Sequence, residues 1–259
     1  MIIGLVSIIL PVYNQKDFIK ESLDSILAQE YAFFELIIIN DGSTDNLSEA
    51  VNKYTDPRIK YHELPHQGLA KTLNYGLRLA NGEFITWFSA DNIMHPTMLC
   101  ELVAALRKAP SHSAAFSGYF HIDANGQVTG HNAKGPYRNP SEFLDKPNRD
   151  FFLAQHCNFG AAFLYRASAC RQAGDFDPLC DGIEDVDYSI RIAKCGPVTY
   201  IPKLLCYYRW HANSMGGRER RGEVTFNPGR TRLWAKIASG DLAQIPRKDL
   251  VECTSIRLN

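Results

Sequence analysis

Carboxylates stand directly after two apolar runs of the sequence, at places where a β-strand would end. Asp41, with Ser43 beside it, follows LIIIN, and Asp91 follows FITWFSA. A carboxylate there can accept a hydrogen bond from a ring N–H, or hold a divalent cation against a diphosphate. The same residues could do no chemistry, because Asp41 and Ser43 can form an Asx turn and Asp91 can cap the turn before Pro96.

Two further acids, Glu184 and Asp185, open the segment GIEDVDYSIRIAKCG. Helical spacing gives this segment an inward apolar face made of Val186, Ile190 and Ala193. Asp187 and Arg191, four residues apart, are expected to form a solvated pair. Glu184 and Asp185 then remain at the helix start, where an acid can take the proton of a hydroxyl nucleophile. An acid there can also serve only as a cap or as a partner of the helix dipole.

The elements that position these acids alternate in the first half of the chain. Apolar runs predict strands at residues 6–12, 36–39, 59–63 and 84–88. Helical periodicity predicts helices at residues 17–29, 46–54, 69–80 and 96–108. This alternation is typical of a doubly wound, Rossmann-like and mostly parallel α/β sheet, in which ligands bind beyond the carboxyl ends of the strands. Residues 11–14, 41–45 and 89–92 should therefore meet on one rim.

The second half of the chain is less regular. We expect strands at residues 114–122, 161–165 and 198–211, the last of them interrupted by a proline. Asn125-Gly126 predicts a hairpin turn after the first of these strands. Residues 129–150 are rich in Gly, Pro, Asn and Lys and predict a loop, and the basic run at 218–221 with the tail after it receives no role.

Composition narrows the class of protein. The chain has 259 residues, with 28 basic and 28 acidic side chains and a formal net charge of +0. This length suits one large α/β domain, and the lack of a basic excess argues against nucleic acid as a partner. None of the 7 cysteines forms a Cys-x-x-Cys pair, which favours a reducing, cytoplasmic compartment. The apolar start at residues 1–12 is too short to span a bilayer, so membrane contact, at the inner face, should be peripheral at most.

Four blocks of the sequence resemble, in order, the inverting family 2 glycosyltransferases of the GT-A fold. They are VSIILPVYNQKDFIKESLDSILAQ with ELIIINDGSTD, HQGLAKTLNYGLRLANGEFITWFSADN, NFGAAFLYRASACRQAGDFDP and GIEDVDYSIRIAKCG. The resemblance covers residues from about 5 to 211. It implies a nucleotide-diphosphate sugar donor, most often a UDP-sugar, with Mn²⁺ or Mg²⁺ and inversion at the anomeric carbon. The acceptor would be a carbohydrate or a lipid-linked molecule, as in polysaccharide or glycoconjugate biosynthesis.

The resemblance divides the chain into a nucleotide-sugar half at residues 1–110, an acceptor and catalytic half of the same domain at 111–215, and a tail at 216–259. Asp41 would accept the N3–H of uracil, and Tyr13 could stack on the base or only pack. The other expected contacts to the sugar donor are Pro11, Asn14, Ser43, Lys71, Asn74 and Ala90. Lys71 and Asn74 lie one helical turn apart and could face phosphate or ribose, although a solvated helix face explains Lys71 equally well.

The metal site departs from the family pattern. The family usually shows Asp-x-Asp or Asp-Asp where this chain has Ser89-Ala90-Asp91-Asn92, so one of the usual acids is missing. Asp91, expected at a solvent-open rim, is the predicted metal ligand. His211, in YYRWHANS, could supplement it, because imidazole suits Mn²⁺ better than Mg²⁺. A lone histidine is as often structural, and the spacing of the other histidines does not resemble a zinc site.

The resemblance places the catalytic base on Asp185, with Glu184 beside it. A nucleotidyltransferase would instead need a Gly-rich phosphate loop near the start, where this chain has PVYN. A dinucleotide oxidoreductase would need G-x-G-x-x-G after the first strand. A non-catalytic nucleotide- or carbohydrate-binding module is the third alternative, and Asp91 with Glu184-Asp185 argues against it. Residues 129–160 and the tail are expected to set acceptor specificity.

Overall fold

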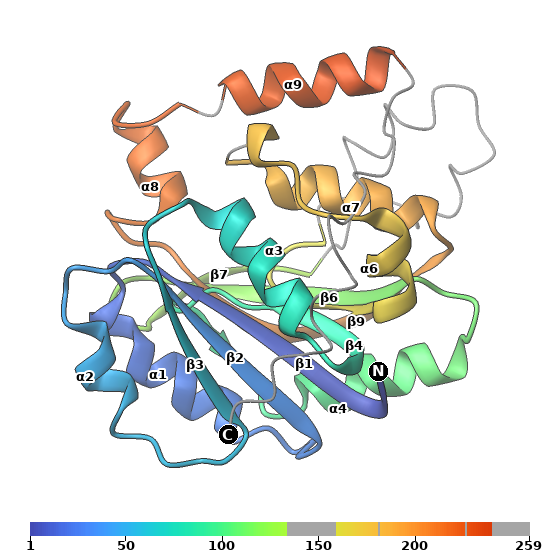
Figure 1. Ribbon diagram of the computed structural model, residues 1–259, viewed down its shortest axis with the longest axis horizontal. Coiled ribbons are helices and arrows are strands. Elements are labelled where there is room, and N and C mark those ends of the chain that lie inside the picture. Colours follow the sequence, from blue (N-terminus) through green and yellow to red (C-terminus); the bar gives the residue numbers. More distant parts are fainter. Residues whose placement is uncertain (134–158, 181, 226, 240–259) are drawn as a thin grey trace.

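One curved β-sheet runs through the described part of the chain, which comprises residues 1–133, 159–180, 182–225 and 227–239 of a computed structural model. Its strands follow the order β3-β2-β1-β4-β8-β6-β9-β5, and β7 pairs with β6. Helices cover both faces of the sheet (Figure 1). Most of the loop predicted at 129–150, and the end of the tail, lie outside the described residues.

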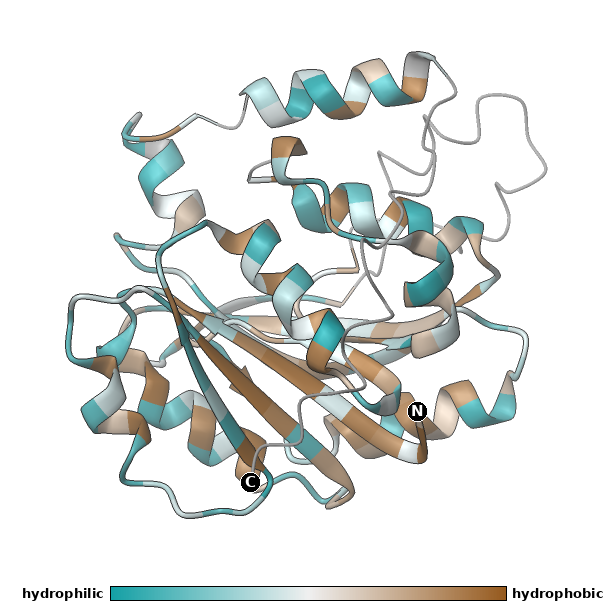
Figure 2. Cartoon of the chain, viewed as in Figure 1, coloured by the Kyte–Doolittle hydropathy of each residue, from teal (hydrophilic) through white to brown (hydrophobic). Residues whose placement is uncertain are grey.

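The first half of the sheet is parallel. β1 (Ile2–Val12) pairs with β2 (Phe34–Asp41) and with β4 (Gly82–Trp87), while β3 (Ile59–Leu64) pairs with β2. Every residue of β2 is buried, as expected for a parallel strand that is covered on both faces. The brown strands at the centre of Figure 2 belong to this apolar core. The prediction of a Rossmann-like α/β sheet is confirmed for this half.

Two hydrophobic clusters hold the helices against the sheet. One face carries α1 (Lys16–Leu27), α2 (Leu47–Val51) and α4 (Met98–Lys108). The other carries α3 (Leu69–Leu79), α6 (Ala167–Ala173) and α7 (Glu184–Lys194). Because side chains alternate along a strand, Ile8 belongs to the first cluster and Ile9 to the second. None of the described helices has the length and hydropathy needed to cross a bilayer.

The second half of the sheet is mixed. β8 (Phe163–Arg166) runs antiparallel to β4 and to β6 (Ala114–Ile122), and β6 is parallel to β9 (Val198–Arg209). β5 (Ile93–Met94) lies antiparallel to β9. The predicted hairpin at Asn125-Gly126 is confirmed, since it joins β6 to the antiparallel β7 (Val128–Asn132). Pro202 lies inside β9, where the register against β6 shifts.

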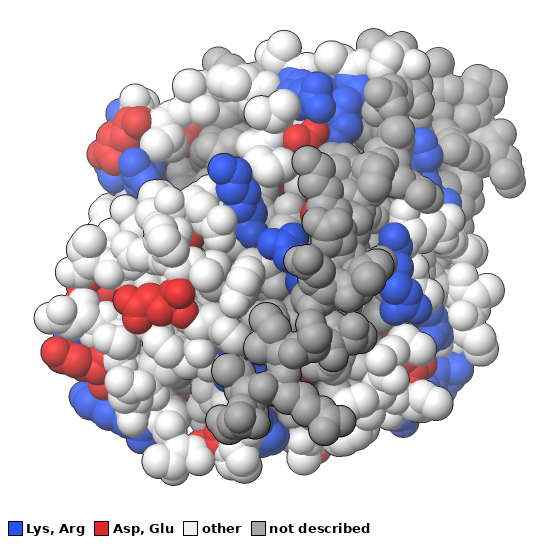
Figure 3. Space-filling model, viewed as in Figure 1, with Lys and Arg blue, Asp and Glu red and all other residues white. Residues whose placement is uncertain are grey.

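The tail contributes two helices, α8 (Met215–Arg220) and α9 (Asn227–Ala238). Leu233 of α9 is buried in the same cluster as α7, so α9 is part of the packed fold. Basic side chains gather at the top of the view in Figure 3, over the end of the molecule where α9 lies in Figure 1. The helical periodicity of this segment is weak, so the sequence alone does not predict that it packs against the rest of the fold.

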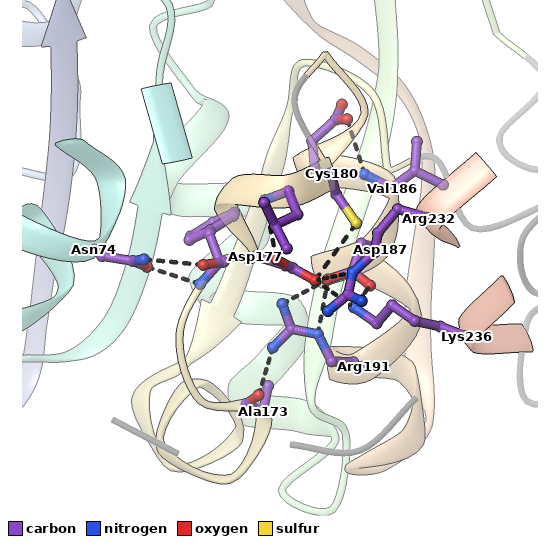
Figure 4. Close-up of polar contacts among 12 residues, drawn as sticks. Asn74, Ala173, Asp177, Cys180, Val186, Asp187, Arg191, Arg232 and Lys236 are labelled. Carbon is purple, nitrogen blue, oxygen red and sulfur yellow. Dashed lines mark hydrogen bonds and ion pairs between the residues drawn. The ribbon is translucent and has the colours of Figure 1, made fainter. Parts of the chain in front are cut away.

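Polar contacts also attach α9 to α7. The prediction that Asp187 and Arg191 pair is confirmed, but the prediction that the pair is solvated is wrong, since their side chains are 0% and 1% exposed. Lys236 of α9 donates to Asp187, and also to Asp177 at 3.2 Å, just before the short helix η2 (Pro178–Cys180). Arg232 adds a second contact to Asp177 at 3.2 Å (Figure 4). The burial of the pair follows from the docking of α9.

We expect Lys236→Met to destabilise the fold by roughly 3 kcal/mol, because two buried carboxylates lose a cation. This loss lies at the lower end of the range usual for removing one partner of a buried ion pair, because Arg191 and Arg232 still contact the two carboxylates. Lys203→Met is the matched control, since Lys203 pairs with Glu101 and its side chain is 54% exposed. That variant should cost no more than about 1 kcal/mol in urea unfolding followed by circular dichroism. Equal losses in both variants would show that α9 is not anchored through Lys236.

Candidate sugar-donor and catalytic site

The carboxyl ends of β1 and β2 meet, as the sequence predicts. The Asn14 backbone N–H donates to Ser43 Oγ at 3.0 Å, and the Asn14 side chain accepts from the Thr44 N–H at 2.8 Å. Asn14 adopts a positive φ of 52°, which turns the chain back toward the second loop. Pro11 is buried within β1, where it pairs with Ile39 of β2, and it therefore lies under the loop that carries Asn14. Residues 11–14 and 41–45 therefore form one edge.

Asp41 lies at this edge with its carboxylate fixed. Its side chain accepts the backbone N–H groups of Gln67 and Gly68, both at 3.0 Å, just before α3 begins. The residue is 3% exposed, and its hydrogen bonds keep the carboxylate in one orientation. The Asx turn here belongs to Asn40, whose Oδ1 accepts the Ser43 N–H at 2.8 Å. Asp41 is therefore not needed to form the turn.

His66 joins Asp41 to Tyr13. Its Nδ1 lies 2.9 Å from Asp41 Oδ2, and its ring stacks on Tyr13 with centroids 4.0 Å apart. Both contacts are of the kind that a nucleotide base would make with Tyr13 and Asp41. Sequence reasoning gave His66 no role, because the contact joins two loops and no local spacing signals it. The edge therefore carries three groups that could surround a base.

Asp91 and His211 are brought together across 120 residues of sequence. Asp91 Oδ2 and His211 Nε2 lie 3.0 Å apart, and the Phe18 ring of α1 packs against His211. Arg209 fixes the loop, since its Nε donates to the Asp91 carbonyl at 2.7 Å. The expectation that Asp91 lies at a solvent-open rim is wrong, because these neighbours leave it 7% exposed.

The Asp91–His211 pair fits a divalent cation that arrives with a diphosphate. One carboxylate and one imidazole converge here, and imidazole suits Mn²⁺. Such a cation would take its other ligands from phosphate oxygens and water. Among the described residues, no group of three or more His, Cys, Asp or Glu side chains could hold a metal.

Three of the predicted contacts to the sugar donor lie in different surroundings. Ala90 is fully buried in the core, so only its backbone could reach a ligand. Asn74 is 6% exposed, and its amide exchanges two hydrogen bonds with the Phe176 backbone, at 2.7 and 2.9 Å. Lys71 is exposed on α3. The expectation that Lys71 and Asn74 face the sugar donor together is wrong, because Asn74 ties α3 to the loop before η2.

Glu184 and Asp185 begin α7, as predicted. Glu184 is 3% exposed, whereas Asp185 is only partly covered. Burial raises the pKa of the Asp185 carboxyl, and this effect outweighs the hydrogen bond from the Val186 N–H at 2.8 Å. A carboxylate with a raised pKa is a stronger base than an ordinary aspartate.

The base candidate and the metal candidate share a neighbour. Tyr208 has a raised pKa, chiefly because it is buried, and the charges of Asp91 and Asp185 both add to the shift. Arg209, which follows Tyr208 directly, donates to the Asp91 carbonyl and to Asn92 Oδ1, so this end of β9 lies beside the Asp91 loop. This arrangement can place a leaving diphosphate near Asp91 and an attacking hydroxyl near Asp185.

The mixed sheet and the loops beyond β1, β2 and β4 define a GT-A type α/β domain, as the sequence predicts. The chain belongs to glycosyl transferase family 2, whose family model matches residues 7–174. Glu184, Asp185 and His211 lie beyond the matched stretch. The family match therefore does not bear on these three residues.

Known proteins agree with this assignment. An uncharacterized glycosyltransferase of Rickettsia felis is 30% identical over 213 residues, which is 80% of this chain and 34% of the relative. The chain thus spans about a third of that relative's length. The structure of S. aureus TarS 1–349 in complex with UDP-GlcNAc has a TM-score of 0.66 at 21% identity, covering 81% of this chain and 59% of that one. The mannosyltransferase PcManGT from Pyrobaculum calidifontis, in complex with GDP-Man and Mn²⁺, has a TM-score of 0.65 at 22% identity. The match covers 90% of this chain and 64% of that one.

Proposed function

We propose that the chain transfers a sugar from a nucleoside-diphosphate donor to an acceptor hydroxyl, with inversion at the anomeric carbon. The observation that carries this proposal is the contact between Asp91 and His211 beyond the carboxyl ends of the strands, in a chain of glycosyl transferase family 2. Inversion follows from a single direct displacement, in which the hydroxyl attacks from the side opposite the leaving diphosphate. The acceptor is a carbohydrate or a lipid-linked molecule bound by residues 111–215.

The nucleotide lies on the edge formed by β1 and β2. Tyr13 stacks on the base, and the fixed Asp41 carboxylate accepts its ring N–H. The edge itself is formed by Pro11, Asn14 and Ser43. The phosphates are contacted by Lys71 and by the backbone of Ala90. Because His66 already contacts Tyr13 and Asp41, the base must share or take over its position.

The diphosphate lies near Asp91. Asp91 and His211 would hold Mn²⁺ or Mg²⁺, and such a cation neutralises the charge of the leaving diphosphate when it is bound. Arg209 keeps the Asp91 backbone in place from β9, and Asn92 Oδ1 accepts the Arg209 N–H at 3.0 Å. The side chain of Asp91 therefore meets the substrate from a rigid loop.

Asp185 takes the acceptor proton as the new glycosidic bond forms. Its position at the start of α7 is supported by the buried Asp187–Arg191 pair and by α9. Glu184 is the second acid of the pair, and its burial suits a supporting role at the helix start. Family membership favours this chemistry over a nucleotidyltransferase or a dinucleotide oxidoreductase.

Base selection offers a direct test of the nucleotide site. Uracil and guanine carry a ring N–H that a carboxylate can accept, whereas adenine and cytosine do not. With Mn²⁺ present, UDP should therefore raise the melting temperature more than ADP or CDP, with GDP reporting the effect of ring size. At about a hundred times the dissociation constant the stabilisation would be roughly 2.7 kcal/mol. Equal shifts for all four nucleotides in differential scanning fluorimetry would remove the base-reading role from Asp41.

A further inference from the structure

Four ring side chains share one face of β6 and the end of β9. Tyr119 and His121 are two residues apart on β6, and Tyr208 and Trp210 are two apart where β9 ends. His121 is paired with Tyr208 across the two strands. Ring centroids lie 5.3 Å apart for Tyr119–His121, 5.7 Å for Tyr119–Tyr208 and 5.6 Å for Tyr208–Trp210. We call these four residues the aromatic wall.

The rings of the aromatic wall are held in place. Trp210 Nε1 donates to His121 Nδ1 at 2.9 Å, and Asn132 Nδ2 donates to the Tyr119 hydroxyl at 3.2 Å. Two glycines lie against the rings: a Cβ on Gly160 would come within 2.5 Å of the Tyr119 ring, and one on Gly216 within 3.0 Å of Trp210. All four rings nevertheless remain only partly covered. A rigid aromatic surface that keeps some exposure is suited to contact with a ligand.

The aromatic wall lies at the proposed reaction centre. Trp210 directly precedes His211 in the sequence, and Arg209 lies between Tyr208 and Trp210. Arg209 Nε donates to the Asp91 carbonyl at 2.7 Å, and its backbone N–H donates to Asn92 Oδ1 at 3.0 Å. The β9 side of the aromatic wall therefore lies next to the Asp91–His211 pair, and the charge of Asp185 adds to the raised pKa of both tyrosines. A group that receives the transferred sugar must approach this same region.

The chemistry of the wall selects among acceptors. A pyranose ring has one apolar face of C–H groups and a rim of hydroxyls. An aromatic ring buries such a face, and tyrosine hydroxyls can hydrogen-bond the rim. A phosphate group would need cations, and Arg209, between Tyr208 and Trp210 in the sequence, is 1% exposed and already bound to Glu21 and to the Asp91 carbonyl.

We propose that the aromatic wall is the acceptor subsite and binds a pyranose ring, so that the acceptor is the end of a carbohydrate chain. This inference rests on the proposed glycosyltransferase function. It makes Tyr208 a specificity-determining residue, with its ring under the acceptor sugar and its hydroxyl toward the sugar's rim.

Saturation-transfer NMR tests this subsite without a known acceptor. Protein ring protons are saturated in the presence of UDP and Mg²⁺. The probes are methyl glycosides of glucose, galactose and N-acetylglucosamine, their β-linked tetrasaccharides, glycerol 3-phosphate and a serine-containing peptide. We expect saturation of the C–H protons on one face of a pyranose. Tyr208→Leu should weaken that sugar's binding by about tenfold, whereas Tyr208→Phe keeps the ring and most of the binding.

Tyr207→Leu is the matched control, because Tyr207 lies next to Tyr208 but stacks on Phe120, with centroids 5.0 Å apart. It should leave sugar binding unchanged. Equal sugar binding in Tyr208→Leu and the unaltered chain would overturn the subsite, as would saturation of only the phosphate probe or the peptide. In either case a normal melting shift with UDP would leave the proposed function standing. Absence of any shift with every nucleoside diphosphate would instead count against the proposed function itself.

Discussion

Asp185→Asn should lower sugar transfer by about 10²–10⁴-fold, the range expected when a general base is lost. Asparagine has nearly the same size as aspartate and can still accept the Val186 N–H, which Asp185 now accepts at 2.8 Å. It cannot take a proton from the acceptor. Nucleotide affinity and melting temperature should therefore hardly change, while the rate constant of transfer falls.

The pH dependence of kcat/KM provides a second test of Asp185 with the same variant. Because burial raises the pKa of Asp185 above the usual 3.8, the base becomes protonated at a higher pH than an ordinary aspartate. In the unaltered chain kcat/KM should fall as the pH is lowered through that raised pKa, and the Asn variant should lack this step. Glu101→Gln is a control for charge at a helix start, since Glu101 lies in the first turn of α4. If Asp185→Asn retains transfer within about threefold when chemistry limits the rate, Asp185 is only a cap.

Asp91→Ala should abolish the metal-dependent part of nucleotide binding. Its carboxylate is the acidic member of the Asp91–His211 pair, so the variant leaves only imidazole to hold the cation. In isothermal titration, UDP affinity in Mn²⁺ should fall to the value that the unaltered chain shows in EDTA. The buried position of Asp91 adds a cost of about 1–3 kcal/mol to the apo fold, because His211 loses its partner.

Asp91→Asn separates these two effects. The amide keeps the size of the side chain and can still hydrogen-bond His211, so the apo fold should be close to that of the unaltered chain. It carries no charge, so binding of Mn²⁺ with UDP should remain weak. Unchanged Mn²⁺-dependent UDP affinity in both variants would show that Asp91 is not a metal ligand.

Local patterns predicted the first half of the fold because β1, β2 and β4 are mostly buried on both faces. The run LIIIN in β2 could be assigned without long-range information. The second half was harder, since β5 has two residues and β8 four, and each depends on partners far away in the sequence. Pro202 is visible in the sequence, but the shift that accompanies it in the register of β9 depends on the pairing of β9 with β6.

The candidate site shows the same division. Asp41, Asp91 and Asp185 could be proposed from the sequence because each follows a recognisable element or begins one. The contacts around them were not found: His66 reaches Asp41 across 25 residues. Asn74 is tied to Phe176 across 102 residues. The Asp187–Arg191 spacing was recognised, but its burial depends on α9, which has weak helical periodicity.

The most direct test of the proposed function is nucleotide release from a panel of UDP-, GDP-, ADP- and CDP-sugars, measured with carbohydrate acceptors and Mn²⁺. The unaltered chain should release nucleoside diphosphate from a UDP-sugar, and EDTA should stop the release. Asp91→Asn and Asp185→Asn should each lose it, the first with weakened UDP binding and the second with normal UDP binding. Release that persists at full rate in both variants would contradict the account, as would binding of UDP-sugars without turnover of any member of the panel.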